Sequence, residues 1–304
     1  MPYTVEIDFA PAYELVVSLY AYVRRGLHKT LYLGSEWVRE TRAQLSGRLA
    51  AELDDQGLEV LHRMSLLLWQ CPGERTPQQF LRWLEQLPPG ELYERLAPWV
   101  ESLPGDLGDI RDRTVHLLSE WNEQYFSRLD PGVLANLAAD GEEKRKLIRG
   151  LDPIEAVELI SNGLRLEPVD GLKKVFLVPQ FHCSPANVLD SFRGVSTCLY
   201  PVTPPSSAGE PPRELLLVTR CLADESRLRI LRLLADKPRS FSDVLQLTGL
   251  AKSTVHHHLL ALRFAGLIRS HFHGDTLQHY SLRETALAEL PERLLGFFHS
   301  GPRG

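Results

Sequence analysis

The stretch LAKSTVHHHLLALR, residues 250–263, has the apolar spacing of an amphipathic helix. Val255, Leu259 and Leu262 recur at i, i+4 and i+7, and residues with this spacing lie on one side of an α-helix. Polar and basic side chains fall on the other sides, namely Lys252, Ser253, His256 and Arg263. The pattern predicts a helix that buries one stripe and leaves a polar face free, as a DNA recognition helix does.

The residues before this helix predict a shorter helix and a sharp turn. Ser240 and Asp243 have the spacing of a capping box, in which two side chains satisfy free backbone amides at a helix start. A helix over residues 241–248 would end at Gly249, which can adopt the left-handed conformation that a tight turn needs. Two short helices joined in this way form a helix-turn-helix.

The residues after the helix predict a β-hairpin. Residues 267–272 and 276–282 read as two strands, and residues 273–275 (HGD) form the turn between them. In this position the hairpin is a wing, whose tip can reach the phosphate backbone or the minor groove. Asp275 at the tip argues against a strong phosphate contact there, because both groups are negative.

Residues 213–300 resemble the ArsR-type winged-helix regulators. Residues 222–234 (LADESRLRILRLL) are similar to that family's ADxTRLRILxLL helix, and residues 258–259 with 262–268 (LRFAGLI) to its HLxxLRxAGLV segment. The resemblance implies a homodimer, formed by the helix before Leu222 and the helix at about residues 284–299. It also implies base or phosphate contacts by Lys252, Ser253, Thr254, His256 and His257, with Arg269 and His271 nearer the wing.

The chemistry of the side chains assigns roles to these candidates. Lys252 and Arg263 are expected to bind phosphate or guanine, and Ser253, Thr254 and His256 to read base edges or nearby phosphates. The partner is then double-stranded operator DNA, with two recognition helices of a dimer in successive major grooves.

We expect no metal site, and no cofactor is indicated. Arsenic- and cadmium-sensing relatives carry a Cys-x-Cys pair where this chain has residues 243–247 (DVLQL), and the Asp/His spacing of the zinc-sensing relatives is absent from the last helix. Consecutive helical residues point about 100° apart, so His256, His257 and His258 cannot close on one ion. The four cysteines are widely separated, and His182 with Cys183 and Cys198 is interpreted as ordinary sheet residues.

Charge is divided unevenly along the chain. The 304 residues carry a formal net charge of -5, yet residues 211–304 hold 13 Lys and Arg against 9 Asp and Glu. This part is therefore +4 and the remainder is -9, which is typical of a basic DNA-binding module joined to an acidic domain. The mild excess predicts salt-dependent binding that needs a dimer.

The rest of the chain predicts a mainly α (α+β) protein. Helical periodicity from about residue 12 to 146 predicts an N-terminal bundle, and short runs at 164–167, 174–178 and 196–202 predict a small antiparallel sheet. Residues 203–212 are rich in Pro, Ser and Gly and predict a linker. The expected domains are therefore 1–202 and a winged helix-turn-helix at 213–304.

The N-terminal domain more weakly resembles the large domain that precedes the DNA-binding module in one group of ArsR-like regulators. Residues 11–15 (PAYEL), 18–19 (SL), 175–179 (VFLVP) and 199–201 (LYP) carry the likeness, and the five tryptophans either line an apolar pocket or fill the core. We expect a small-molecule sensor, with a pure dimerisation or protein-interaction domain as the alternative. An enzymatic domain is the least favoured, because no P-loop, GxGxxG, nucleophile elbow or HExxH occurs.

The sequence thus predicts a cytoplasmic, homodimeric, DNA-binding repressor. No apolar run approaches 18 residues and no secretory leader is evident, so no membrane partner is expected.

Overall fold

A computed structural model describes residues 3–54, 63–203 and 209–299. The chain divides into two compact units. The N-terminal unit comprises Tyr3–Arg149 and Gly171–Val202, and the C-terminal unit comprises Gly150–Asp170 and Thr203–Gly304. Half of the predicted linker, residues 204–208, lies outside the described residues.

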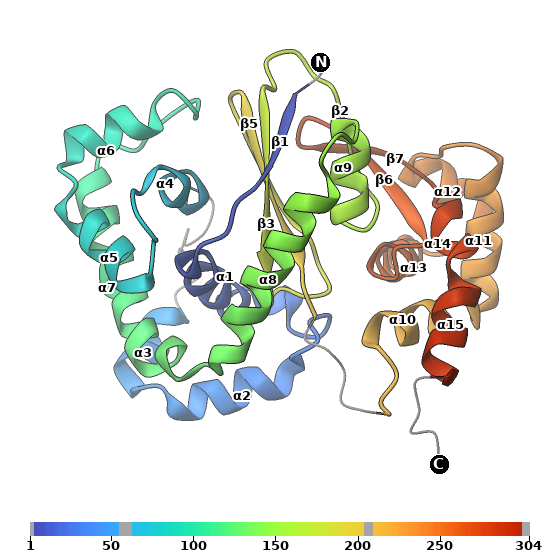
Figure 1. Ribbon diagram of the computed structural model, residues 1–304, viewed down its shortest axis with the longest axis horizontal. Helices are drawn as coiled ribbons and strands as arrows, with labels where there is room; N and C mark the ends of the chain where they lie inside the picture. Colours follow the sequence, from blue (N-terminus) through green and yellow to red (C-terminus); the bar gives the residue numbers. More distant parts are fainter. Residues whose placement is uncertain (1–2, 55–62, 204–208, 300–304) are drawn as a thin grey trace. The chain divides into compact units, whose positions relative to one another are not determined.

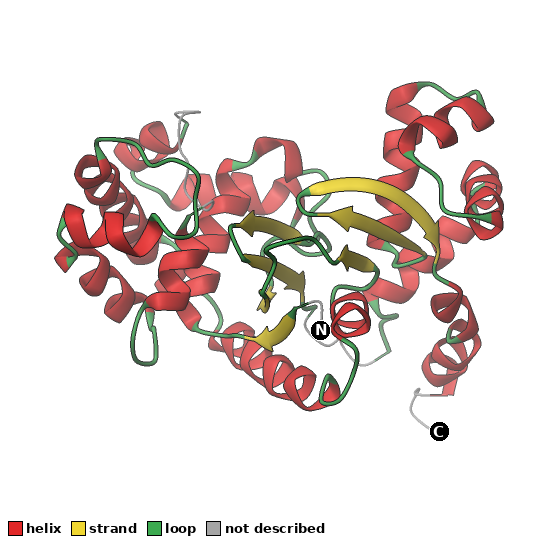
Figure 2. Ribbon diagram, turned by 90° about the horizontal axis from the view of Figure 1, so that it is seen from above, coloured by secondary structure: helices red, strands yellow, loops and turns green. Residues whose placement is uncertain are grey.

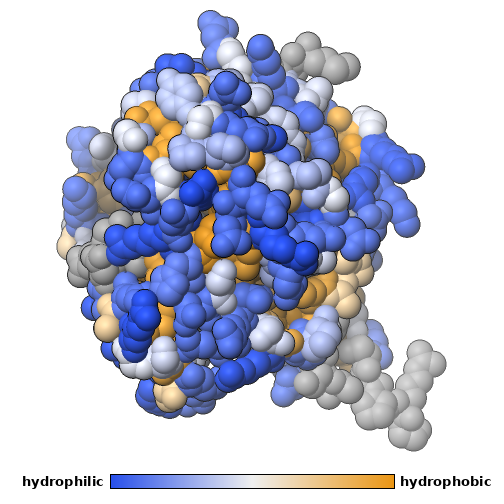
Figure 3. All heavy atoms as spheres, turned by 90° about the vertical axis from the view of Figure 1, so that its left-hand side faces the viewer, coloured by the Kyte–Doolittle hydropathy of each residue, from blue (hydrophilic) through white to orange (hydrophobic). Residues whose placement is uncertain are grey.

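Helices make up most of the N-terminal unit (Figures 1 and 2). One helix start in this unit is fixed by a capping box, which Thr76 forms with Gln79 just before the helix Pro77–Gln86. Figure 3 faces the helical side, where polar side chains cover most of the surface. The helices are α1 (Pro11–Val23), α2 (Gly34–Gln44), α3 (Gly47–Leu53), α4 (Met64–Gln70), α5 (Pro77–Gln86), α6 (Pro89–Leu96), α7 (Leu107–Gln124) and α8 (Pro131–Leu147), with 3-10 turns at Arg25–Leu27 and Phe126–Arg128.

The sheet of the N-terminal unit is mixed, so the prediction of an antiparallel sheet was wrong. Its order is β1-β3-β5-β4, built from β1 (Thr4–Ile7), β3 (Lys174–Gln180), β5 (Val195–Pro201) and β4 (Val188–Phe192). β3 pairs in parallel with β1 and β5, and only β4 with β5 is antiparallel. β3 and β5 are buried along nearly their whole length, as strands of parallel sheets commonly are.

The core of the N-terminal unit surrounds α1. Leu15, Val16 and Leu19 are fully buried, so this helix is enclosed on several sides. Trp121 is also fully buried, and its Nε1 donates to Ser18 Oγ at 2.9 Å. The other four tryptophans are partly buried against the same core. These contacts favour the interpretation of the tryptophans as core residues.

The C-terminal unit contains a winged helix-turn-helix. Its helices are α10 (Arg213–Leu222), α11 (Glu225–Asp236), α12 (Phe241–Thr248), α13 (Lys252–Phe264), α14 (Glu284–Ala288) and α15 (Leu290–His299). The wing consists of β6 (Ile268–His273) and β7 (Thr276–Leu282), which pair in antiparallel fashion. The predicted helices and the predicted hairpin are confirmed, except that the helix expected at about residues 284–299 is divided into α14 and α15.

One segment differs from the expected division of the chain. Residues 150–170, which the sequence analysis assigned to the N-terminal domain, form α9 (Pro153–Ile160) and β2 (Leu164–Glu167) within the C-terminal unit. β2 pairs in parallel with β6, so the second sheet has the order β2-β6-β7. The predicted strand at 164–167 exists, but its partner is the wing. No helix in the described ranges is long and apolar enough to cross a membrane.

Candidate nucleic-acid interface

Local interactions fix the turn between α12 and α13. Ser240 Oγ accepts from the Asp243 amide at 3.1 Å, and Asp243 Oδ2 accepts from the Ser240 amide at 2.9 Å, which completes the predicted capping box. α12 then ends at Gly249, whose φ of 66° is left-handed. This turn sets the start of α13 at Lys252.

The faces of α13 follow the apolar spacing. Val255, Leu259 and Leu262 are buried in the core of the C-terminal unit. Lys252, Ser253, His256 and His257 are exposed and Thr254 is half-buried, so five predicted contact residues share the first two turns. Ala251 gives the helix no side-chain cap, so its first amides remain available to an anion.

Three other predicted contact residues are engaged inside the unit. The Arg263 guanidinium lies 6.0 Å from the centroid of the Phe272 ring, and burial lowers its pKa. Arg269 Nε donates to Glu158 Oε1 at 2.6 Å. His271 lies between Glu167 Oε1, 3.1 Å from its Nδ1, and the Ser281 hydroxyl, 2.8 Å from its Nε2. Arg269 and His271 lie on the wing strand β6, as expected, and all three side chains are engaged by other residues of the C-terminal unit.

This geometry agrees with the comparisons to known proteins. The family described as bacterial regulatory protein, arsR family, matches residues 224–270. The transcriptional repressor SdpR of Bacillus subtilis is 30% identical over 84 residues, which are 28% of this chain and 92% of the relative. The chain belongs to the ArsR family.

A second ArsR-family relative is the HTH-type transcriptional regulator KmtR of Mycobacterium tuberculosis. It is 31% identical over 85 residues, which are 28% of this chain and 65% of that protein. No solved structure matches the chain. The likeness is therefore confined to the part of the chain that holds the winged helix-turn-helix.

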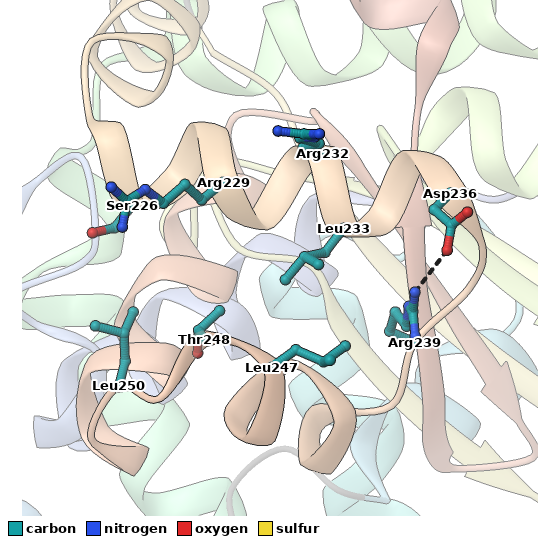
Figure 4. A pocket seen from close by; sticks show the side chains of 9 residues that line it. All are labelled: Ser226, Arg229, Arg232, Leu233, Asp236, Arg239, Leu247, Thr248 and Leu250. Atoms are coloured by element: carbon teal, nitrogen blue, oxygen red, sulfur yellow. Dashed lines mark hydrogen bonds and ion pairs between the residues drawn. The ribbon is translucent and has the colours of Figure 1, made fainter.

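The winged helix-turn-helix, from α10 to α15, is called the ArsR module below. It also has a basic groove that was not predicted from the sequence. A cavity of about 640 Å³ lies between α11 and α12, with Leu233 and Leu247 among its apolar lining (Figure 4). Arg239 pairs with Asp236 at 2.7 Å, whereas exposed Arg232 has no ion pair in the described part of the chain. Arg229 and Arg232 are three residues apart in the motif RLRILRLL, a spacing that places them on one side of a helix.

His258 differs from its two neighbours because it points into the ArsR module. Its residue is only 8% exposed, and Arg227 Nε approaches its Nδ1 at 3.5 Å. Burial lowers the pKa of His258, Arg227 lowers it further, and the Asp224 carboxylate opposes both. The net shift favours the neutral form of the imidazole.

A hydrogen-bonded chain occupies the interior of the N-terminal unit. Buried Glu14 accepts from the backbone amides of Phe181 and His182 and lies 2.5 Å from His182 Nδ1. The Tyr125 hydroxyl lies 2.8 Å from His182 Nε2 and accepts from Trp37 Nε1 at 2.8 Å. If His182 carries its proton on Nδ1, each donor has one acceptor, so the chain can hold the loop after β3 without a bound group.

Two cysteine thiols of the N-terminal unit are poorly placed for redox chemistry. Cys183 and Cys198 are both fully buried, and burial raises the pKa of each thiol. A protonated, inaccessible thiol is a weak nucleophile. In the described residues, no three His, Cys, Asp or Glu side chains cluster in a way that could hold a metal ion.

Proposed function

We propose that this protein is a homodimeric, sequence-specific DNA-binding transcriptional repressor. The observation that carries the proposal is the start of α13, where Lys252, Ser253, His256 and His257 are exposed behind an uncapped helix N-terminus. Side chains of this kind on the first turns of a recognition helix contact base edges and phosphates in the major groove. SdpR is named a repressor, and the proposal extends that role to this chain.

Lys252 and the free amides of α13 would bind phosphate, and His256 and His257 would reach base edges. Ser253 and half-buried Thr254 complete this face. The formal charge of +4 over residues 211–304 is small for one DNA-binding module, so two copies are needed for firm binding. A dimer places its recognition helices about one DNA turn apart on a pseudo-palindromic operator.

The last helix supports the dimer. Leu295 and Phe298 of α15 are 54% and 65% exposed, and no residue of this helix is buried within the chain. Two large exposed apolar side chains on one terminal helix are typical of a surface that a partner covers. A second copy of the chain is the partner that the ArsR relationship favours.

The N-terminal unit would act as a sensor that changes the DNA affinity of the dimer. A cavity of about 40 Å³ among α4, α5, α6 and α7 is lined mostly by apolar side chains and has room for about one water molecule. An effector of metabolite size would need more room, so its binding would have to open this unit. If no effector exists, the same unit would serve only to dimerise and space the DNA-binding modules.

The test is selection of binding sites from random duplex DNA with the full chain. We expect a palindromic motif for the wild type and its loss in the His256→Ala, His257→Ala double variant. His116→Ala serves as the control, because this half-exposed histidine lies on α7 of the N-terminal unit. Absence of any motif with the wild type would refute sequence-specific binding.

A further inference from the structure

The wing of this ArsR module has a third strand supplied by a distant part of the sequence. We call residues 150–170, with α9 and β2, the wing clip. β2 pairs with β6 from Leu164 opposite Ser270 to Glu167 opposite His273, which makes β6 the central strand. On the other edge, Arg239 bridges Tyr280 of β7. The wing hairpin is thus paired with β2 along the β6 edge and bridged at one position on the β7 edge.

The backbones of clip and wing meet closely at Gly163. The Gly163 carbonyl accepts from the Ser270 amide at 2.8 Å. A Cβ at Gly163 would lie 2.7 Å from the Ile268 carbonyl oxygen, and the φ of +116° is one that other residues rarely adopt. Any side chain at this position would push the clip away from β6.

The Glu158 carboxylate of the wing clip lies within 4.0 Å of three arginines. Glu158 accepts from Arg165 at 3.0 Å and from Arg269 at 2.6 Å, and its Oε1 lies 4.0 Å from Arg283 Nε. Its side chain is only 11% exposed, so solvent screens these pairs weakly. Arg269 is on β6 and Arg283 follows β7, so Glu158 ties the clip to both strands of the wing.

Short connections join the clip to the N-terminal unit. Residues 148–152 separate α8 from α9, and residues 168–173 separate β2 from β3. Connections of five or six residues span at most about 20 Å, so they limit how far the elements that they join can separate. β3 is a central strand of its sheet and runs directly into Phe181 and His182, whose amides Glu14 binds.

We propose that the wing clip positions the wing for DNA binding and transmits the state of the N-terminal unit to it, with Glu158 as the positioning residue. This inference rests on the proposed DNA-binding function. A change at the hydrogen-bonded chain behind β3 would move β3, β2 and then β6. The wing, and with it operator affinity, would respond without any new contact to DNA.

The first experiment compares full-length Glu158→Gln and Gly163→Ala with the wild type. We expect each to weaken binding to the selected operator about tenfold and to accelerate amide hydrogen exchange in β6. Gly73→Ala is the control, because Gly73 also has a positive φ but its Cβ would meet only a flexible Gln79 side chain at 3.9 Å. Glu158→Asp, which keeps the charge, should restore part of the affinity.

The outcomes separate positioning from mere support. If folded Glu158→Gln and Gly163→Ala bind operator within twofold of the wild type, the positioning role is wrong, even if β6 exchanges faster. Should Gly163→Ala fail to fold, the conservative Glu158→Gln decides. Wild type that binds no DNA would refute the proposed function, and the second experiment, which uses no DNA, would still decide whether the clip transmits.

The second experiment removes one hydroxyl in the N-terminal unit. Tyr125→Phe removes the hydroxyl that links Trp37 to His182. With the two connections at their natural lengths, we expect this variant to show faster amide hydrogen exchange in β6. Insertion of a Gly-Ser pair after Gly150 and after Asp170 lengthens both connections and should abolish that response. Unchanged β6 exchange in Tyr125→Phe, or a response that survives the insertions, would overturn transmission through the clip.

Discussion

Glu158 Oε1 and Arg269 Nε lie 2.6 Å apart although 111 residues separate them in the chain. The pair joins a helix that precedes the N-terminal sheet's main strands to the first strand of the wing. Because the side chains of Glu158 and Arg269 are 11% and 25% exposed, their attraction is less screened than that of a surface pair. The pair therefore ties the stability of the wing to a segment outside the ArsR match.

Removal of the Glu158 carboxylate should destabilise the C-terminal unit. Glu158→Ala leaves Arg269 and Arg283 partly buried without their counter-ion, which we expect to cost about 2 kcal/mol of the free energy of unfolding. Urea unfolding of the full chain, monitored by amide hydrogen exchange in β6, measures this loss of stability.

Glu225→Ala is the matched control for this change. Its partner Arg229 is 75% exposed and Glu225 is 79% exposed, so the loss should stay below about 0.5 kcal/mol. Equal losses in the two variants would contradict a special role of the Glu158 pairs.

The helix-turn-helix of α12 and α13 could be predicted from the sequence because its signals are local. The capping box at Ser240, the left-handed Gly249 and the apolar spacing of residues 255–262 each involve a few neighbouring residues, and all are present in the structure. Arg263 was misjudged, since it follows Val255 by eight residues and so flanks the buried stripe by only about 80°. Its guanidinium accordingly packs on Phe272.

The partners of the strands could not be predicted in the same way. Residues 164–167 alternate as a half-buried strand does, but alternation does not say which strand pairs with it. The parallel sheet did leave a signal, because residues 175–178 (VFLV) form an unbroken apolar run, typical of a strand buried on both faces. Arg269 and His271 were correctly placed on the wing, but the carboxylates that engage them lie in the clip.

Salt dependence should distinguish exposed Lys252 from half-buried Arg263 on α13. Lys252→Ala should make the fall of log K with log salt less steep by about 1.8, because a dimer that carries the change in both copies loses two phosphate contacts. Arg263→Ala should leave the slope unchanged, since its guanidinium lies over Phe272 and burial lowers its pKa. Fluorescence anisotropy measures the affinity for operator DNA at salt concentrations of about 50 to 200 mM. A reduced slope in Arg263→Ala alone would reverse this assignment.

Acid should destabilise the C-terminal unit through His258. Burial and Arg227 lower the pKa of His258 below its ordinary 6.5, so the folded state binds fewer protons than the unfolded state as pH falls through that value. Stability from this group is present above the unfolded pKa and is lost below it, by at most about 1.4 kcal/mol per pH unit. Urea unfolding at several pH values between about 5 and 8 gives the slope.

Two substitutions show whether His258 carries that slope. His258→Gln has no titrating group and should flatten the dependence on pH. His256→Gln removes an exposed histidine of the same helix that is not among the groups shifting the pKa of His258, and it should leave the slope as it is. A slope that persists in His258→Gln would assign the effect to another group.

The dimer proposal predicts that one exposed leucine matters and another does not. Leu295 on α15 is 54% exposed and Leu247 on α12 is 51% exposed, so an aspartate disturbs the interior of neither. We expect Leu295→Asp to halve the mass measured by sedimentation, because a buried, unpaired carboxylate at the seam opposes association. Leu247→Asp should keep the mass of the wild type. DNA affinity should fall steeply only in Leu295→Asp, since a single module of small positive charge cannot hold the operator alone. If both variants keep the wild-type mass, α15 is not the seam.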